Sequence, residues 1–149
     1  MIVRELESGD LEELLGLYAH LHDSDSPLPP ADEVDAVWRE LLASSRYRYV
    51  GATVDGHLVS SCALTVIPNL TRGCRPFGVI ENVVTHSGFR GRGLGRAVLA
   101  RALELAWAQD CYKVMLLTGR KDEAIIRFYE GAGFDREGKQ GFVARAPGE

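Results

Sequence analysis

The segment Arg90–Arg96 (RGRGLGR) combines three alternating glycines with three arginines. Glycine adopts positive φ angles at little cost, so this backbone can curl until several N–H groups point the same way. A helix that begins near Gly93 adds the N–H donors of its first turn, and the arginines add charge-assisted donors. The pattern indicates a nest for a phosphate or pyrophosphate. The alternative is that the glycines only make a tight connection between a strand and a helix.

Two common nucleotide-binding signatures do not fit this segment. The glycines follow a G-x-G-x-G spacing, and Arg96 stands where a dinucleotide fingerprint needs its third glycine. The lysine and the serine or threonine of a P-loop are also absent. The segment therefore predicts the charge of a ligand without predicting its identity.

A second group of polar residues lies near the N-terminus, and two readings apply to it, a metal site and an acidic surface. His20 and His22 stand two positions apart at the end of a predicted helix, so their side chains diverge and we expect no metal. Acidic residues surround them and make this part of the surface negative, and a solvated acidic loop explains them. These residues are Asp23, Asp25, Asp32, Glu33 and Asp35.

The whole chain has the size and composition of one globular domain, residues 1–149, with 46% hydrophobic and 26% charged residues. Its 17 basic and 21 acidic residues give a net charge of −4, which argues against a nucleic-acid partner. Three widely spaced cysteines, Cys62, Cys74 and Cys111, favour a reducing compartment. No signal peptide or membrane span is evident, so we expect a cytoplasmic location and no membrane partner.

The hydrophobic periodicity predicts an α/β fold around a mixed sheet. Asp10 and Glu13 are expected to form a capping box for the first helix, and Asp55-Gly56 a hairpin turn. Trp38 and Trp107 fall on apolar helix faces and are predicted to be core residues. The predicted strands are 1–6, 47–54, 57–67, 77–85, 113–118 and a final pair within 134–145, and the predicted helices are 10–20, 31–43, 93–109 and 122–131.

Two motifs in this order resemble the GNAT superfamily of N-acetyltransferases. The first is Arg90-x-x-Gly93-x-Gly95, which follows the strand sequence IENVVT at 80–85. The second is the sequence FYEGAGF at 128–134, which stands in for the F-Y-x-x-x-G-F of the family. The resemblance implies a single-domain fold with a mixed, mostly antiparallel sheet of about six to seven strands, flanked by about four helices.

The resemblance also implies acetyl-CoA as the co-substrate, without a metal. In the family, the strand that ends at Thr85 splays from its neighbour at 113–118 and bonds the pantetheine arm, while the glycine loop holds the pyrophosphate. Asp122 stands where relatives often carry asparagine. The cofactor-binding residues implied in this way are Val83, Val84, Thr85, Arg90, Gly91, Arg92, Gly93, Leu94, Gly95, Arg96, Thr118 and Asp122.

Two residues are implied as catalytic. Tyr129 matches the tyrosine of the family that donates a proton or a hydrogen bond to the coenzyme A sulfur; the alternative is a packed aromatic residue. Glu81 lies in the strand that approaches the thioester and is the candidate to accept the amine proton. The alternative for Glu81 is a solvated carboxylate or a salt-bridge partner.

The expected function is therefore transfer of an acetyl group from acetyl-CoA to the primary amine of a small molecule, by direct attack in a ternary complex. In the family fold the loop between the first two helices borders the acceptor pocket, so its acidic residues imply a cationic amine. An alternative acceptor is a protein N-terminus or lysine. An alternative from another class is a module that binds or senses acyl-CoA without catalysis. Many relatives form homodimers, and the predicted C-terminal strands offer edges for such pairing.

Overall fold

The computed structural model describes residues 1–149, which divide into two compact units, Met1–Leu116 and Leu117–Glu149. All five strands belong to the first unit and form one sheet in the order β1-β2-β3-β4-β5. The strands are β1 (Ile2–Glu5), β2 (Tyr47–Val54), β3 (His57–Ile67), β4 (Phe77–Thr85) and β5 (Val114–Leu116).

The sheet is mixed and mostly antiparallel, as predicted. The first four strands pair antiparallel in chain order, and β5 joins β4 in the parallel direction. The turn between β2 and β3 has positive φ at both Asp55 (51°) and Gly56 (82°). These angles match the hairpin turn that connects twisted strands with two residues, so the predicted turn is confirmed.

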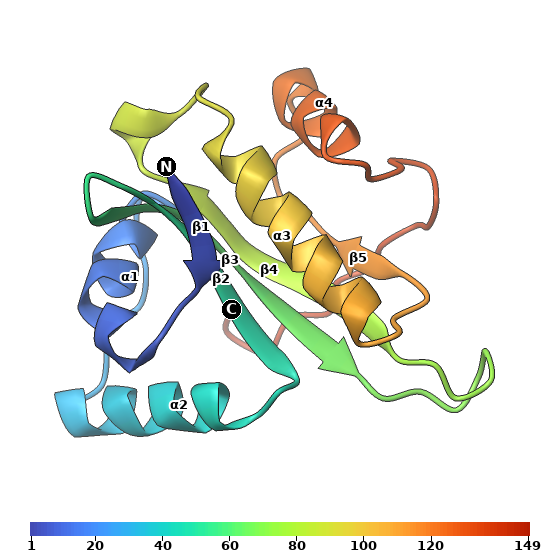
Figure 1. The fold of residues 1–149 in the computed structure, drawn as a ribbon, viewed down its shortest axis with the longest axis horizontal. Helices are drawn as coiled ribbons and strands as arrows, with labels where there is room; N and C mark the ends of the chain where they lie inside the picture. Colours follow the sequence, from blue (N-terminus) through green and yellow to red (C-terminus); the bar gives the residue numbers. More distant parts are fainter. The chain divides into compact units, whose positions relative to one another are not determined.

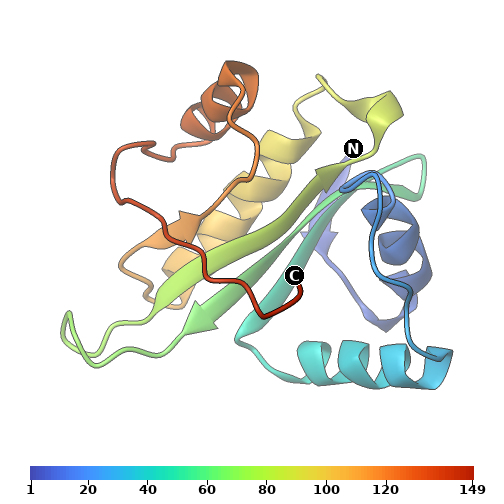
Figure 2. The ribbon, with the colours of Figure 1, turned by 180° about the vertical axis from the view of Figure 1, so that it is seen from behind.

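Three helices of the first unit cover both faces of its sheet. Helix α3 (Leu94–Ala108) lies across one face (Figure 1). Helices α1 (Leu11–Tyr18) and α2 (Ala31–Ala43) lie on the opposite face, as the view from behind shows (Figure 2). The second unit contains α4 (Glu123–Gly131). Two short 3-10 turns, η1 (Ser8–Asp10) and η2 (Ser87–Phe89), precede α1 and α3.

Each helical layer buries a compact set of apolar side chains. Under α1 and α2, Trp38 is only 4% exposed, donates from Nε1 to the Ser8 carbonyl at 3.3 Å and meets the Tyr49 ring edge-on. The buried residues of α3 are Leu94, Gly95, Val98, Leu99, Ala102, Leu105 and Ala106. The cluster under α1 and α2 consists of Leu6, Leu14, Leu17, Trp38, Leu58 and Val84.

The predicted capping box at the start of α1 is wrong. The Asp10 carboxylate instead pairs with Arg4 at 2.7 and 2.8 Å and accepts from the Glu7 N–H at 2.7 Å. Glu13 accepts from the backbone N–H of Leu58 at 2.6 Å. The carboxylate that the motif assigned to a local cap therefore ties α1 to β3, because that long-range N–H would otherwise lack a partner.

The predicted strands within 134–145 and the burial of Trp107 are also wrong, so the sheet has five strands rather than six or seven. Within the second unit, no strand is present to pair with this segment. Arg136 instead binds Glu123 of α4 at 2.8 Å and also bonds Glu130. Trp107 is 51% exposed near the end of α3, where its apolar neighbours are already buried without it.

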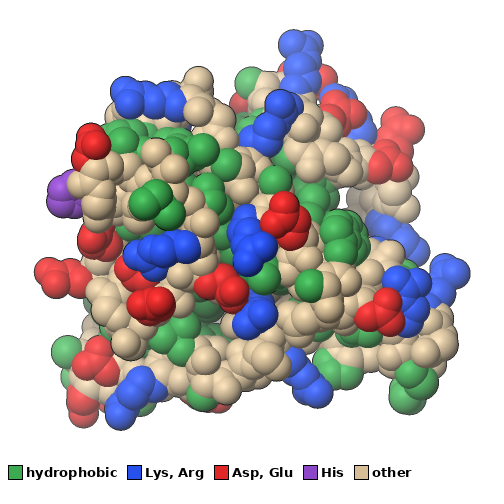
Figure 3. All heavy atoms as spheres, viewed as in Figure 1, with side chains coloured by type: hydrophobic (Ala, Val, Ile, Leu, Met, Phe, Trp, Pro, Cys, Tyr) green, Lys and Arg blue, Asp and Glu red, His purple; other side chains and the backbone are tan.

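The surface carries charges of both signs. In the view of Figure 3, basic and acidic side chains are interspersed with apolar ones instead of gathering into one basic face. This distribution agrees with the small net charge of −4. None of the helices is both long and apolar enough to span a membrane.

Candidate active site

The sheet opens along one edge of β4. Pairing between β4 and β5 runs from Gly78–Val114 to Ile80–Leu116 and ends there, while β4 continues to Thr85. The stretch from Glu81 to Thr85 therefore has β3 on one side and no strand on the other. Its backbone groups on the open side are available to an extended ligand in the way that a sheet edge accepts an added strand.

A β-bulge lies at the point where β4 loses its neighbour. Ser61 faces Val84 and Ala63 faces Glu81, so two residues of β4, Asn82 and Val83, stand opposite a single residue of β3. Asn82 has φ of +53°, a left-handed conformation that asparagine tolerates better than most side chains. A bulge bends a strand and re-aims its backbone groups, and such bulges concentrate near active sites. Sequence reasoning missed Asn82, whose only signal is its residue type.

Tyr18 of α1 lies against this bulge. Its phenol packs at the margin of the cluster under α1 and α2. Burial raises the pKa of Tyr18 well above its usual value, Tyr49 raises it further, and a hydrogen bond with the Asn82 side chain offsets part of the shift. The bulge is thus in contact with the apolar layer behind it as well as with β3.

Glu81 is exposed and is the first residue of β4 beyond the last pair with β5. Its carboxylate takes part in none of the ion pairs of the structure, so the salt-bridge alternative for Glu81 finds no partner. An exposed carboxylate at the mouth of the open edge is accessible to an incoming amine.

Thr85 ends the open edge and is held from both sides. Its hydroxyl lies 2.8 Å from the Ser60 hydroxyl, and Ser60 also donates to the Val84 carbonyl at 3.1 Å. The Thr85 carbonyl accepts from Arg90 Nε at 3.2 Å. These bonds fix the direction in which the chain leaves the strand and enters the glycine loop.

The glycine loop has the conformation that a nest requires. Gly91 and Gly93 have φ of +75° and +79°, angles that an L side chain rarely adopts. No atom lies within 4 Å of a Cβ placed on either glycine, so the space beside both residues is open. Gly93 is the N-cap of α3 and supplies no capping side chain. The N–H groups of the first helical turn, at Leu94, Gly95 and Arg96, therefore have no capping side chain, as at a helix N-terminus that binds an anion.

The three arginines of the loop differ in what they contact. Arg90 is engaged by backbone carbonyls, those of Thr85 at 3.2 Å and His20 at 3.1 Å. The Arg92 guanidinium lies over the Phe89 ring, 4.9 Å from its centroid. Neither Arg92 nor Arg96 forms an ion pair with a carboxylate, so both charges are available to an anionic ligand. Arg90 instead shapes the loop.

Three further predicted site residues belong to the second unit and are described within it. The Thr118 hydroxyl accepts from the Arg120 N–H at 3.2 Å. Asp122, which precedes α4, pairs with Arg120 at 3.2 Å. The Tyr129 ring is half-buried and meets the rings of Phe128 and Phe134 at 5.0 and 6.3 Å. The cofactor and catalytic roles of these residues stay predictions.

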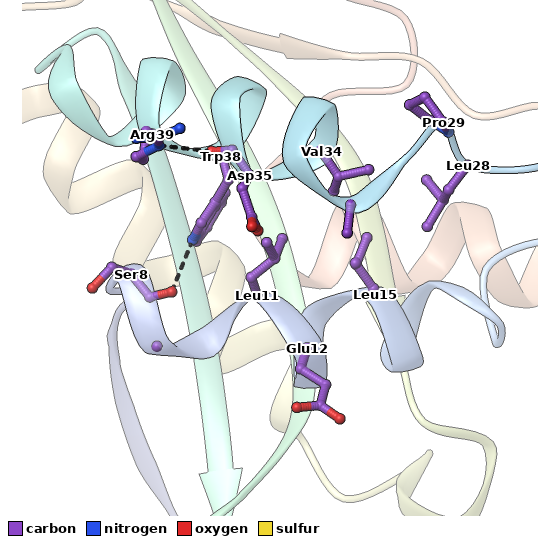
Figure 4. A pocket seen from close by; sticks show the side chains of 12 residues that line it. Ser8, Leu11, Glu12, Leu15, Leu28, Pro29, Val34, Asp35, Trp38 and Arg39 are labelled. Carbon is purple, nitrogen blue, oxygen red and sulfur yellow. Dashed lines mark hydrogen bonds between the residues drawn. The ribbon is translucent and has the colours of Figure 1, made fainter.

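A groove of the first unit lies elsewhere, between α1 and α2 (Figure 4). It has a volume of about 810 Å³ and an apolar wall that includes Leu11, Leu15 and Val34. None of the predicted catalytic or cofactor-binding residues lines it. The site is therefore an exposed strand edge and loop, as suits a long flexible ligand, and not an enclosed cavity.

Comparison with known proteins assigns this chain to one family. The model of the Acetyltransferase (GNAT) family matches residues 12–134. The chain belongs to this family. It is an acetyltransferase, and the family to which it belongs uses acetyl-CoA. The resemblance and the fold class inferred from sequence are confirmed.

Individual members of the family are similar to this chain over most of its length. The acetyltransferase is 34% identical over 144 residues to glucosamine 6-phosphate N-acetyltransferase of Trypanosoma brucei brucei, covering 93% of this chain and 91% of that one. It is 31% identical over 134 residues to N-alpha-acetyltransferase RimI of Mycobacterium tuberculosis, covering 89% and 77%. A solved structure of an acetyltransferase-like protein from Agrobacterium tumefaciens strain C58 superimposes with a TM-score of 0.90 at 45% identity, covering 98% and 100%.

Proposed function

We propose that this acetyltransferase moves an acetyl group from acetyl-CoA to the primary amine of a small amino sugar phosphate. The observation that carries the proposal is the continuity of two features, the open edge of β4 and the glycine loop at the start of α3. An extended pantetheine arm fits the first feature and a pyrophosphate fits the second. Arg92 and Arg96 supply the charges for the phosphates.

The chemistry needs a neutral amine, a polarised carbonyl and a protonated leaving thiolate. In the proposed reaction, Glu81 takes a proton from the acceptor amine, directly or through water. The amine nitrogen then attacks the thioester carbonyl carbon, whose oxygen is polarised by N–H groups of the open β4 edge. The C–S bond breaks, and the sulfur receives a proton from Tyr129. The role of Tyr129 rests on the sequence motif alone.

The acceptor class rests on the relatives. The trypanosomal relative is named for glucosamine 6-phosphate and matches nearly the full length of both chains. Asp32, Glu33 and Asp35 of α2 are exposed, but they do not decide the acceptor, because an acidic surface that attracts an ammonium group also repels a phosphate. Acetylation of a protein N-terminus is the second candidate, favoured by the 31% identity to the N-alpha-acetyltransferase.

Release of free coenzyme A thiol, followed with an amine panel, tests the proposal. The panel contains glucosamine 6-phosphate, glucosamine, spermidine and a short peptide with a free N-terminus. The proposal predicts the highest kcat/KM for glucosamine 6-phosphate. Preference for the peptide would transfer the assignment to the second candidate, and coenzyme A binding without any thiol release would indicate a sensing module.

A further inference from the structure

Two histidines from distant parts of the chain stack beside the glycine loop. His20 follows α1 and His86 follows β4, and their ring centroids lie 4.0 Å apart at an interplanar angle of 39°. Both rings line a pocket of about 460 Å³ with residues of α1 and β3. Neither ring belongs to the open strand edge or to the nest itself.

Each ring accepts a hydrogen bond from the backbone of the loop. The Ser87 N–H donates to His20 Nδ1 at 3.3 Å, and the Gly88 N–H donates to His86 Nδ1 at 3.0 Å. A ring nitrogen accepts a hydrogen bond only when it carries no proton. This arrangement therefore requires the Nδ1 atom of both rings to carry no proton.

Ring contacts connect the two histidines with Arg92 of the glycine loop. The Phe89 ring meets His86 edge-on at 5.4 Å, and the Arg92 guanidinium lies over Phe89 at 4.9 Å. Arg90 bonds the His20 carbonyl and thereby fastens the same loop to the end of α1. The two histidines thus hold the segment from which Arg92 and the positive-φ glycines project.

We propose that His20 and His86 are positioning residues that shape the coenzyme A phosphate loop only while both are neutral, so that coenzyme A binding weakens as the pH falls. This inference rests on the proposed function, since it takes the glycine loop as the phosphate site. Protonation of either Nδ1 would turn an acceptor into a donor that faces a backbone N–H. It would also place a cation against the second ring.

The charged groups around the pair do not cancel this effect. Arg90 adds a positive charge from the loop itself. Glu13 of α1, Asp55 of the hairpin turn and His57 of β3 line the same pocket as the two rings. Glu13 is already occupied by the Leu58 N–H at 2.6 Å and lies 3.9 Å from His57 Nδ1. A direct charge effect would act in the opposite direction, because a cationic imidazole near a phosphate would tighten binding at low pH.

Calorimetric titration of the full chain with coenzyme A, between about pH 8 and about pH 5.5, tests the inference, because imidazoles ordinarily change charge in this range. The decisive variant combines His20→Asn and His86→Asn. The asparagine Oδ1 can replace each Nδ1 acceptor but cannot take a proton. His22→Asn is the matched control, since His22 is exposed and has none of these contacts. The two single variants serve if the double variant does not fold.

In the wild type and in His22→Asn, Kd should rise by about fivefold or more on acidification, the effect of losing one or two hydrogen bonds. The double variant should lose this extra slope and retain only the slope due to titration of coenzyme A itself. An unchanged slope in the double variant, or tighter wild-type binding at low pH, would overturn the inference. Arg96→Ala distinguishes a failure of this inference from a failure of the proposed function. If the variant leaves the Kd for coenzyme A unchanged, the glycine loop is not the phosphate site and the proposed function itself fails.

Discussion

Ile80 faces Leu116 in the last residue pair that joins β4 to β5, and β4 continues beyond it to Thr85. Glu81 is the next residue along the strand, and the Asn82 bulge follows at once. The end of strand pairing therefore coincides with the candidate base and with the strained turn of the backbone. Strained, sparsely populated backbone angles persist where the surroundings enforce them, often at functional sites.

Glu81→Gln should lower kcat by about 100-fold and remove the acidic limb of the pH–rate profile, because the amide cannot accept the amine proton. KM for acetyl-CoA should change little, since the carboxylate is not placed on the phosphates. Steady-state kinetics across pH would measure both effects. Glu104→Gln, on the exposed side of α3, is the control. A wild-type profile in Glu81→Gln would require another base.

Tyr129→Phe should lower turnover by about 10-fold to 100-fold, with little change in affinity for acetyl-CoA, because only the phenolic proton is lost. The ring contacts with Phe128 and Phe134 are retained by phenylalanine, so the fold should be preserved. Tyr112→Phe is a matched control. Unchanged turnover would remove Tyr129 from the mechanism.

Arg92→Ala and Arg96→Ala should each raise the Kd for coenzyme A by about 10-fold, the typical effect of removing one charge-assisted hydrogen bond. The weakening should shrink at high salt, because screening reduces the contribution of exposed charges. Arg101→Ala is the control, since Arg101 lies further along α3 and pairs with Glu104. Titration calorimetry at two salt concentrations distinguishes these outcomes.

Asp10→Asn should reduce the free energy of unfolding by about 1 kcal/mol at neutral pH. The hydrogen bond from Arg4 lowers the pKa of Asp10, with a further contribution from the Glu7 N–H and opposition from burial. A lowered pKa stabilises the fold above the unfolded-state pKa, and this stability is lost as the pH falls through the folded value. The difference between wild type and variant should therefore begin to shrink near about pH 4 and disappear only below the lowered folded-state pKa of Asp10.

Urea unfolding at several pH values measures that difference. Asp110→Asn is the control, because Asp110 pairs with Arg75 at an exposed site and has positive φ that asparagine tolerates. The control should change stability by less than about 0.5 kcal/mol. If the Asp10→Asn variant were as stable as the wild type at neutral pH, the bonds of the Asp10 carboxylate would contribute nothing measurable to the free energy of unfolding, which would contradict the prediction.

Sequence patterns predicted the helices, strands and turns best where residues close together in the chain decide the structure. The bounds of α2, β2, β3 and β4 agree with prediction, because the Asp55-Gly56 turn fixes the hairpin and long apolar runs mark the buried strands. The nest was predictable for the same reason, because glycine is the residue that adopts positive φ most easily and both Gly91 and Gly93 do so.

Features that depend on distant partners were not predictable. Glu13 looks like a capping residue in sequence and in fact binds the N–H of Leu58. Tyr18 and Asn82 meet only after the sheet and α1 have assembled, and so do His20 and His86. A final pair of strands was predicted within 134–145, yet Phe142 and Val143 in this segment are exposed and have no partner strand in the second unit.

Amide hydrogen exchange of the full chain, with and without coenzyme A, measures most directly whether the open edge of β4 and the glycine loop form one ligand site. We predict slower exchange at backbone amides of the open stretch, Val83 to Thr85, and at Gly91, Gly93, Leu94 and Gly95 when coenzyme A binds. Amides of the β2–β3 hairpin turn, Asp55 and Gly56, should not change. Binding of coenzyme A without protection of the loop and the β4 edge, or with protection confined to other elements, would contradict the proposed site.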